Sequence, residues 1–167
     1  MAEKEDIFSS KIKYEGLFDF KEFYRFCYQW VAEEMQLDTV EDKYSEKISG
    51  DSKGIKIEWT GTRKVTDYFK YSVGIKFEIM NLTNVEITQN GRKIKMNNGS
   101  VEVKVKGTLI RDYEGKFEKT ASKKFMRSIY EKWVISSRVE QFETKLISDC
   151  NEFLAQAKAF LDLEGRK

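Results

Sequence analysis

Histidine and proline are both absent from the 167 residues of this chain. Without histidine the chain has no His-based catalytic triad, no His-ligated metal site and no imidazole acid–base chemistry. Without proline it has no cis-proline turn and no proline-rich linker. We therefore expect no catalytic residues, no metal site and no cofactor, and the chain is more typical of a binding protein than of an enzyme.

Cysteine is scarce, and both cysteines, Cys27 and Cys150, fall on apolar faces of predicted helices. This placement favours buried, reduced thiols, although a disulfide joining the two helices stays open. The first six residues are polar and charged, so they do not resemble a signal peptide. No apolar run reaches the roughly 18 residues of a membrane-spanning helix. We therefore expect a cytoplasmic protein with no transmembrane segment.

The composition is that of a well-solvated globular protein, with 40% apolar, 35% charged and 14% aromatic residues. The high aromatic content indicates a real core, and the length favours one domain over residues 1–167. The 30 basic and 28 acidic residues are interspersed, and the net charge is only +2. With no basic tail or stripe along the sequence, we do not expect a nucleic acid partner.

The first half of the chain predicts one strand, one helix and further strands. Alternation predicts a strand over 7–15, and Asp19 with Glu22 resembles a capping pair at the start of a helix over 20–36. Phe20, Phe23, Tyr24, Cys27, Val31 and Met35 would form its apolar stripe. Alternation then predicts strands over 40–48, 55–59 and 69–79, with one apolar and one polar face.

The segment from Val85 to Leu109 contains two Asn-Gly pairs, Asn90-Gly91 and Asn98-Gly99. Asn-Gly strongly favours a two-residue hairpin turn, so the segment predicts an antiparallel meander. The first turn places Gln89 opposite Arg92, Ile87 opposite Ile94, and Val85 opposite Met96. The second places Met96 also opposite Val101 and Ile94 opposite Val103, with Lys95 between Glu86 and Glu102.

Residues 122–167 show helical periodicity to the end of the chain, through Val139, Phe142, Leu146, Cys150, Phe153, Ala157 and Phe160. One continuous helix of this length would be about 60 Å long, more than a compact domain of this size spans. The run Val134-Ile135-Ser136-Ser137 is a plausible site for a kink. We expect a long C-terminal helix with a break near 134–137.

The order of these elements is strand, helix, six strands, long helix. It resembles the helix-grip architecture of START-like lipid-transfer and polyketide-cyclase proteins. The resemblance implies an α+β fold in which a curved antiparallel sheet of about seven strands (β-α-β6-α) packs on the C-terminal helix around a cavity. The segments over 112–117 and 130–133 also resemble those of small uncharacterised archaeal proteins, and this likeness implies no activity.

Two charged groups offer candidate chemistry. Asp112 and Glu114 would share a face if their strand persists, where they could bind a cation or transfer protons, but a turn at Gly115 makes solvated side chains the simpler interpretation. Lys119, Lys123, Lys124 and Arg127 could bind an anion or an acidic lipid headgroup, or form a solvated helix face. The glycine-rich motifs of phosphate-binding loops are absent from the sequence.

The aromatic residues are the candidate ligand site: Trp30, Trp59, Phe69, Tyr71, Phe77 and Trp133. They would line an apolar pocket between the sheet and the helices, or else form a solid core. The first hypothesis is therefore a non-enzymatic module that binds a hydrophobic small molecule or lipid. The alternative is an interaction or structural domain that forms a homodimer or binds a protein partner through its helices. An enzyme that uses carboxylates, lysines or tyrosines is the third hypothesis.

Overall fold

The computed structural model describes residues 3–111, 113, 121–129 and 136–165. The elements are β1 (Glu3–Phe18), α1 (Phe20–Gln29), the π-helical turn η1 (Trp30–Glu34), β2 (Asp38–Ser49), β3 (Ser52–Lys64), β4 (Phe69–Gln89), β5 (Arg92–Arg111), α2 (Ala121–Ile129) and α3 (Ser136–Glu164). The described strands form one antiparallel sheet in the order β1-β5-β4-β3-β2. The α+β class with an antiparallel sheet is as predicted.

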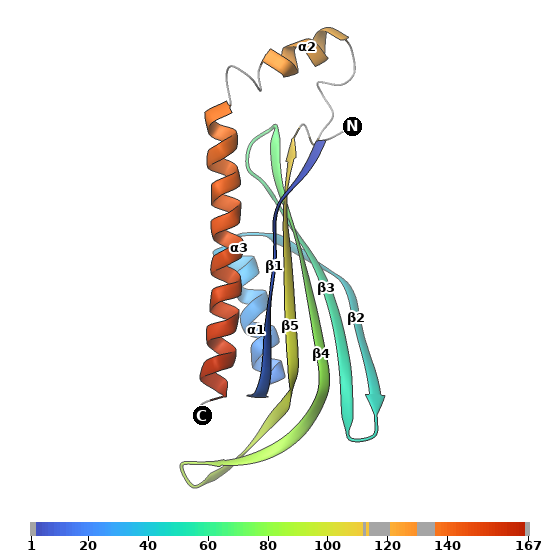
Figure 1. Cartoon of the computed structure of the whole chain (residues 1–167), viewed down its shortest axis with the longest axis vertical. Coiled ribbons are helices and arrows are strands. Elements are labelled where there is room, and N and C mark those ends of the chain that lie inside the picture. The colour runs from blue at the N-terminus through green and yellow to red at the C-terminus, as the bar shows by residue number, and fades with distance from the viewer. Residues whose placement is uncertain (1–2, 112, 114–120, 130–135, 166–167) are drawn as a thin grey trace.

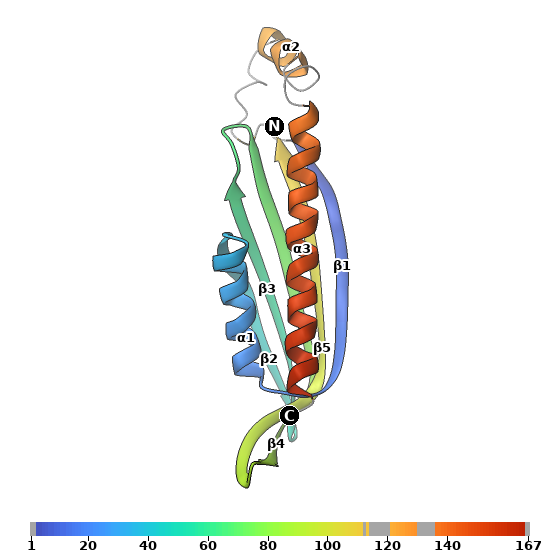
Figure 2. The same cartoon turned by 90° about the vertical axis from the view of Figure 1, so that its left-hand side faces the viewer.

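Helices α1 and α3 lie side by side on the same face of the sheet (Figures 1 and 2). We call this the inner face and the opposite one the outer face. The alternation in β4 decides which side chains point to the inner face and which to the outer face. From Phe69 to Ile79, every second residue is buried, and the residues at the alternate positions are partly or fully exposed. The core therefore lies in one layer between the sheet and the helices.

Asp19 caps α1 as predicted, because its side chain accepts a hydrogen bond from the Glu22 amide at 3.3 Å. The predicted helix over 20–36 continues as an α-helix only to Gln29. It then widens into η1, where the Met35 amide donates to the Trp30 carbonyl at 3.1 Å. Phe23, Cys27 and Val31 are buried against the sheet side of this unit.

The Asn90-Gly91 turn is confirmed, and both residues have positive φ, 51° and 77°. All three register predictions at this turn hold, as does the pair Glu86 with Lys95. The turn joins the ends of β4 and β5, which project beyond the rest of the sheet as a two-stranded arm (Figure 1).

The second predicted turn, at Asn98-Gly99, is wrong. β5 passes straight through these residues, and Gly99 pairs with Gly16 of β1. A Cβ on Gly99 would lie 3.0 Å from the Met80 carbonyl oxygen and 3.1 Å from the Leu82 Cα, so the glycine permits a close backbone approach. On the facing strand the register shifts between Met80 and Thr83, where Asn81 has φ 55°.

The register predictions that depended on this turn are wrong as well. Val101 pairs with Ile79 and Tyr14, not Met96, and Val103 pairs with Phe77 and Ile12, not Ile94. Glu102 accordingly lies opposite Glu78 and Lys13 rather than next to Lys95. The sheet has five strands instead of about seven, because the segments on each side of Asn81 belong to one strand and so do those on each side of Asn98-Gly99.

Helix α3 packs over β1 and β5, and four residues of its predicted stripe are buried: Leu146, Cys150, Phe153 and Ala157. Phe160, the last predicted position, is only partly buried, and its neighbour Leu161 is fully buried. The helix lies close to β5 at Gly107, where an added Cβ would lie 3.3 Å from the Cys150 Sγ. Within the predicted helix over 122–167, the structure describes α2 and α3. Residues 134 and 135 of the expected kink lie outside the described residues.

Candidate functional site

Four of the six predicted ligand-binding aromatics lie in the core. Trp59, Phe69, Tyr71 and Phe77 are between 1% and 3% exposed. The Trp59 and Phe77 rings are 4.7 Å apart, whereas Phe69 lies 5.2 Å from the Phe142 ring of α3. The Tyr71 hydroxyl donates to the Phe142 carbonyl at 2.7 Å. Each of these four side chains contacts a residue of α1 or α3.

Of the other two predicted residues, the structure describes Trp30 and not Trp133. Trp30, at the start of η1, is partly buried with its ring 6.0 Å from that of Phe26. Trp133 lies outside the described residues, as do Asp112, Glu114 and Lys119. The structure thus brings Trp59 and Phe77 into direct contact with each other. Phe69 and Tyr71 both contact Phe142 of α3 instead.

A small polar cluster borders the aromatic core at Glu41 of β2. Its carboxylate accepts hydrogen bonds from the Tyr24 hydroxyl at 2.7 Å and from the Trp59 indole at 3.2 Å. Burial, followed by the bond to Glu41, raises the pKa of Tyr24 to about 12. The Tyr24 phenol is therefore protonated at neutral pH. In this cluster the Glu41 carboxylate provides the hydrogen-bond acceptor for the buried Trp59 indole.

Both cysteines are free and buried, which confirms the interpretation as reduced thiols. Burial raises the pKa of Cys27 well above its usual value, and burial with the nearby Asp149 charge raises the pKa of Cys150 to about 12. Such thiols are poor nucleophiles because they stay protonated. Among the residues that the structure describes, no group of three His, Cys, Asp or Glu side chains is placed to hold a metal ion.

The outer face of the sheet carries a row of three lysines on neighbouring strands. Lys104 of β5 lies directly opposite Lys11 of β1 on one side and opposite Lys76 of β4 on the other. Like charges directly opposite one another destabilise a sheet. This row is therefore a feature of the outer face that the stability of the fold does not explain.

A hollow of about 460 Å³ lies along this row. Its lining includes Lys11, Lys76, Lys104, Lys106 and Gly74 and contains no acidic residue. Gly74 is in the interior of β4, and a Cβ added to it would have no other atom within 4 Å. A glycine without a close neighbour weakens a strand with no gain in packing. Here its missing side chain leaves space between the lysines.

The lysines of the hollow have only surface ion pairs. Their partners are Glu58 for Lys76 at 3.9 Å, Glu102 for Lys104 at 3.5 Å and Asp6 for Lys106 at 3.1 Å. Their side chains are 54–68% exposed. Within the described part of the chain Lys11 has no ion pair. Because exposed ion pairs are weak, an anion in the hollow could compete with these partners for the ammonium groups.

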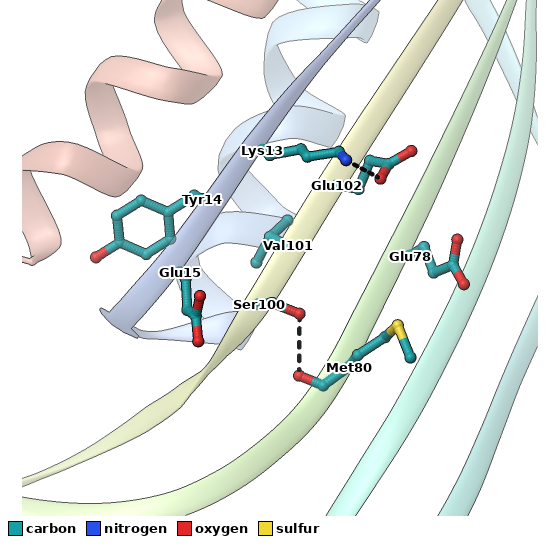
Figure 3. A pocket seen from close by; sticks show the side chains of 8 residues that line it. All are labelled: Lys13, Tyr14, Glu15, Glu78, Met80, Ser100, Val101 and Glu102. Atoms are coloured by element: carbon teal, nitrogen blue, oxygen red, sulfur yellow. Dashed lines mark hydrogen bonds and ion pairs between the residues drawn. The ribbon is translucent and has the colours of Figure 1, made fainter.

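A second hollow of about 440 Å³ is lined by residues further along the same strands β1, β4 and β5. Acidic side chains predominate among its charged residues (Figure 3). Glu15, Glu78 and Glu102 line it, and Lys13 lies 3.8 Å from Glu102. Glu78 and Glu102 are directly opposite each other on β4 and β5. The outer face therefore has a lysine row beside a glutamate pair, and the charges are ordered by rows even though they are mixed along the sequence.

Alternation alone could assign each of these lysines to the polar side of a strand, but it could not bring them together. Lys11, Lys76 and Lys104 are far apart in the sequence, and their alignment depends on the pairing of β5 with both β1 and β4. The turn predicted at Asn98-Gly99 pairs Val101 with Met96 instead of with β1 and β4. With that register, the sequence does not predict the lysine row. The only local signal was Gly74 in the middle of an otherwise strong strand pattern.

A scan of protein-family models finds no match to this chain, and no curated protein matches its sequence. Separately, none of the described helices combines the length and apolar character needed to cross a membrane.

Proposed function

We propose that this protein is a non-enzymatic binding module whose ligand is a small phosphorylated molecule carrying several negative charges. The observation that supports it is the lysine row Lys11–Lys104–Lys76, aligned beside the open position at Gly74. Locally unfavourable choices of this kind are expected at functional sites. A multivalent anion placed over Lys104 lies within reach of all three ammonium groups and offsets their repulsion.

The ligand binds to the outer face through charge–charge contacts with flexible side chains. The hollow of about 460 Å³ is within the range of small-molecule sites. Exposed charges are screened by salt, with a Debye length of about 10 Å at 0.1 M. Binding is therefore strongest at low ionic strength and weakens as salt is added.

Calorimetric titration of the full chain with inorganic tripolyphosphate tests the proposal. We expect saturable binding at one site, weakened by roughly 1.4–5-fold in Lys104→Gln, since an exposed charge contact is worth about 0.2–1 kcal/mol. The control is Lys95→Gln, which removes the same charge from the projecting arm and should leave the affinity unchanged. Equal losses in the two variants, or no saturable binding, would refute the site.

A second titration separates small phosphorylated ligands from nucleic acid. A single-stranded oligonucleotide should bind no more tightly per phosphate than tripolyphosphate. If affinity instead grows with oligonucleotide length and also falls in Lys95→Gln, the ligand is a nucleic acid tracking across the surface, and the small-ligand proposal fails.

The hydrophobic-ligand function stays a second prediction, together with the START-like helix-grip relationship. A single antiparallel sheet with a long C-terminal helix over one face supports it. Native mass spectrometry of the purified full chain tests it together with the homodimer alternative. A co-purifying lipid favours the first and a stable dimer mass favours the second, whereas a bare monomer argues against both.

A further inference from the structure

Helix α2 exposes three large apolar side chains. Phe125, Met126 and Ile129 are 67%, 60% and 41% exposed. At 100° per residue these positions fall within an arc of about 100°, so they form one continuous apolar side. Single exposed apolar residues are ordinary, but three on one side of a helix of nine residues mark an interaction surface.

The charged residues of α2 are all basic. Its charged residues are Lys123, Lys124 and Arg127, and the helix contains no acidic residue. Their positions occupy the arc opposite Phe125, which makes α2 a basic amphipathic helix. Lys123 and Lys124 belong to the first turn of α2, where the helix dipole does not favour cations, whereas Arg127 belongs to the last turn, where it does. The two first-turn lysines point to an anionic partner.

The position of α2 keeps its apolar side away from the core of the domain. The helix lies beyond the ends of the strands and of α3 in both views (Figures 1 and 2). In this arrangement Phe125 is 67% exposed and Ile129 is 41% exposed. A flat surface can therefore approach this end of the molecule without displacing any core element.

We propose that α2 binds the surface of an anionic lipid bilayer, with Phe125, Met126 and Ile129 entering the headgroup boundary and its cations contacting lipid phosphates and carboxylates. An interfacial helix needs an apolar side, a cationic side and little negative charge, and α2 has all three. At about 13 Å in length it supplies one contact of modest strength. This inference is independent of the phosphorylated ligand on the outer face.

Flotation of the full chain with lipid vesicles tests the proposal. Binding is expected to vesicles of equal parts phosphatidylcholine and phosphatidylserine, and to be much weaker to phosphatidylcholine alone. Phe125→Ser should weaken it by about 10-fold or more. Lys124→Gln should weaken it by roughly 5-fold, because one cation near an anionic surface is lost.

Two control variants make the result specific. Ile48→Ser removes an apolar side chain that is 75% exposed on β2, and it should bind vesicles like the unmodified chain. Lys104→Gln should also keep vesicle binding, whereas Phe125→Ser should keep tripolyphosphate binding, so either proposal can fail alone. Equal binding of Phe125→Ser and Ile48→Ser would overturn the proposal. So would a protein dimer without vesicles that Phe125→Ser abolishes, because the partner would then be a second copy.

Discussion

Two glycines on opposite faces of the sheet should respond in opposite directions to a larger side chain. Gly74 on the outer face has open space around it, whereas Gly107 on the inner face lies against α3 and β1. They are neighbours across β4 and β5, since Val73 pairs with Gly107. Neither has a positive φ, so the backbone accepts any residue at both positions. The comparison therefore isolates the effect of space.

Gly74→Thr should stabilise the protein by about 1 kcal/mol. Replacing a strand glycine recovers roughly 0.5–1 kcal/mol of backbone entropy, and a β-branched residue adds strand preference on a scale of about 1 kcal/mol. The new side chain would also lie opposite Thr60 on β3, where a Thr–Thr pair is favourable. For a chain of this size, a gain of 1 kcal/mol corresponds to a rise in Tm of about 2–4 °C.

Gly107→Ala should destabilise the protein despite the same entropic gain. The added methyl would lie 3.3 Å from Cys150 Sγ and Phe8 Cβ and 3.4 Å from Leu146 Cδ2. These atoms belong to two elements, and the Phe8 Cβ is fixed to its backbone, so they cannot all move away together. Overpacking of this kind costs about 1–3 kcal/mol, which leaves a net loss centred on roughly 1 kcal/mol after the entropy term of about 0.5–1 kcal/mol.

Urea denaturation followed by tryptophan fluorescence, to which the buried Trp59 contributes, measures both changes. A gain of stability in Gly107→Ala comparable to that in Gly74→Thr would refute the packing argument at α3. A loss in Gly74→Thr would refute the claim that the outer position is open. If Gly74→Thr is more stable and also binds tripolyphosphate less tightly, the glycine is retained for the ligand at a cost in stability.

The remaining predictions concern the core, the arm and the ligand. Cys27 and Cys150 should resist a thiol reagent at pH 8 until urea is added. The free energy of unfolding should also fall as pH rises from about 9 towards 12. The reason is that the Cys150 thiol has a pKa near 9 in the unfolded chain and about 12 in the folded one, so only the unfolded chain loses this proton in that range. Asn97→Ala should cost about 1–2 kcal/mol in the urea assay, since the Phe20 amide donates to the Asn97 side chain at 3.0 Å and would lose this acceptor. In calorimetry, affinity should increase from orthophosphate to pyrophosphate to tripolyphosphate, and equal affinities would count against a site built from three lysines.

Local patterns predicted much of this fold. Alternation identified the faces of β4, the capping pair at Asp19 located the start of α1, and Asn90-Gly91 set a register that holds through Val85 and Met96. Each of these depends on residues within one or two turns of the chain. The predicted stripe of α3 is buried from Leu146 to Ala157, because its period is a local property.

The incorrect predictions arose where one local sequence pattern is compatible with two different structures. Glycine after asparagine permits a positive φ at Gly91, but at Gly99 it permits two strands to approach closely. The sequence around each is the same kind of alternating pattern, and only the position of β1 against β5 distinguishes them. The lysine row was missed for the same reason, since it exists only in the pairing of three strands.

The two faces of the sheet differ in how freely they can serve binding. On the inner face, Trp59 and Phe77 are in ring contact, and replacing either would leave a cavity in the core. On the outer face, Lys11, Lys76 and Lys104 contribute little to stability, and their neighbouring strands are about 4.8 Å apart, so the lysine Cα atoms span roughly 10 Å. The lysine row destabilises the fold by little more than the repulsion between its ammonium groups. A ligand of opposite charge offsets that repulsion. A binding surface can therefore be maintained on this face without loss of the core beneath it.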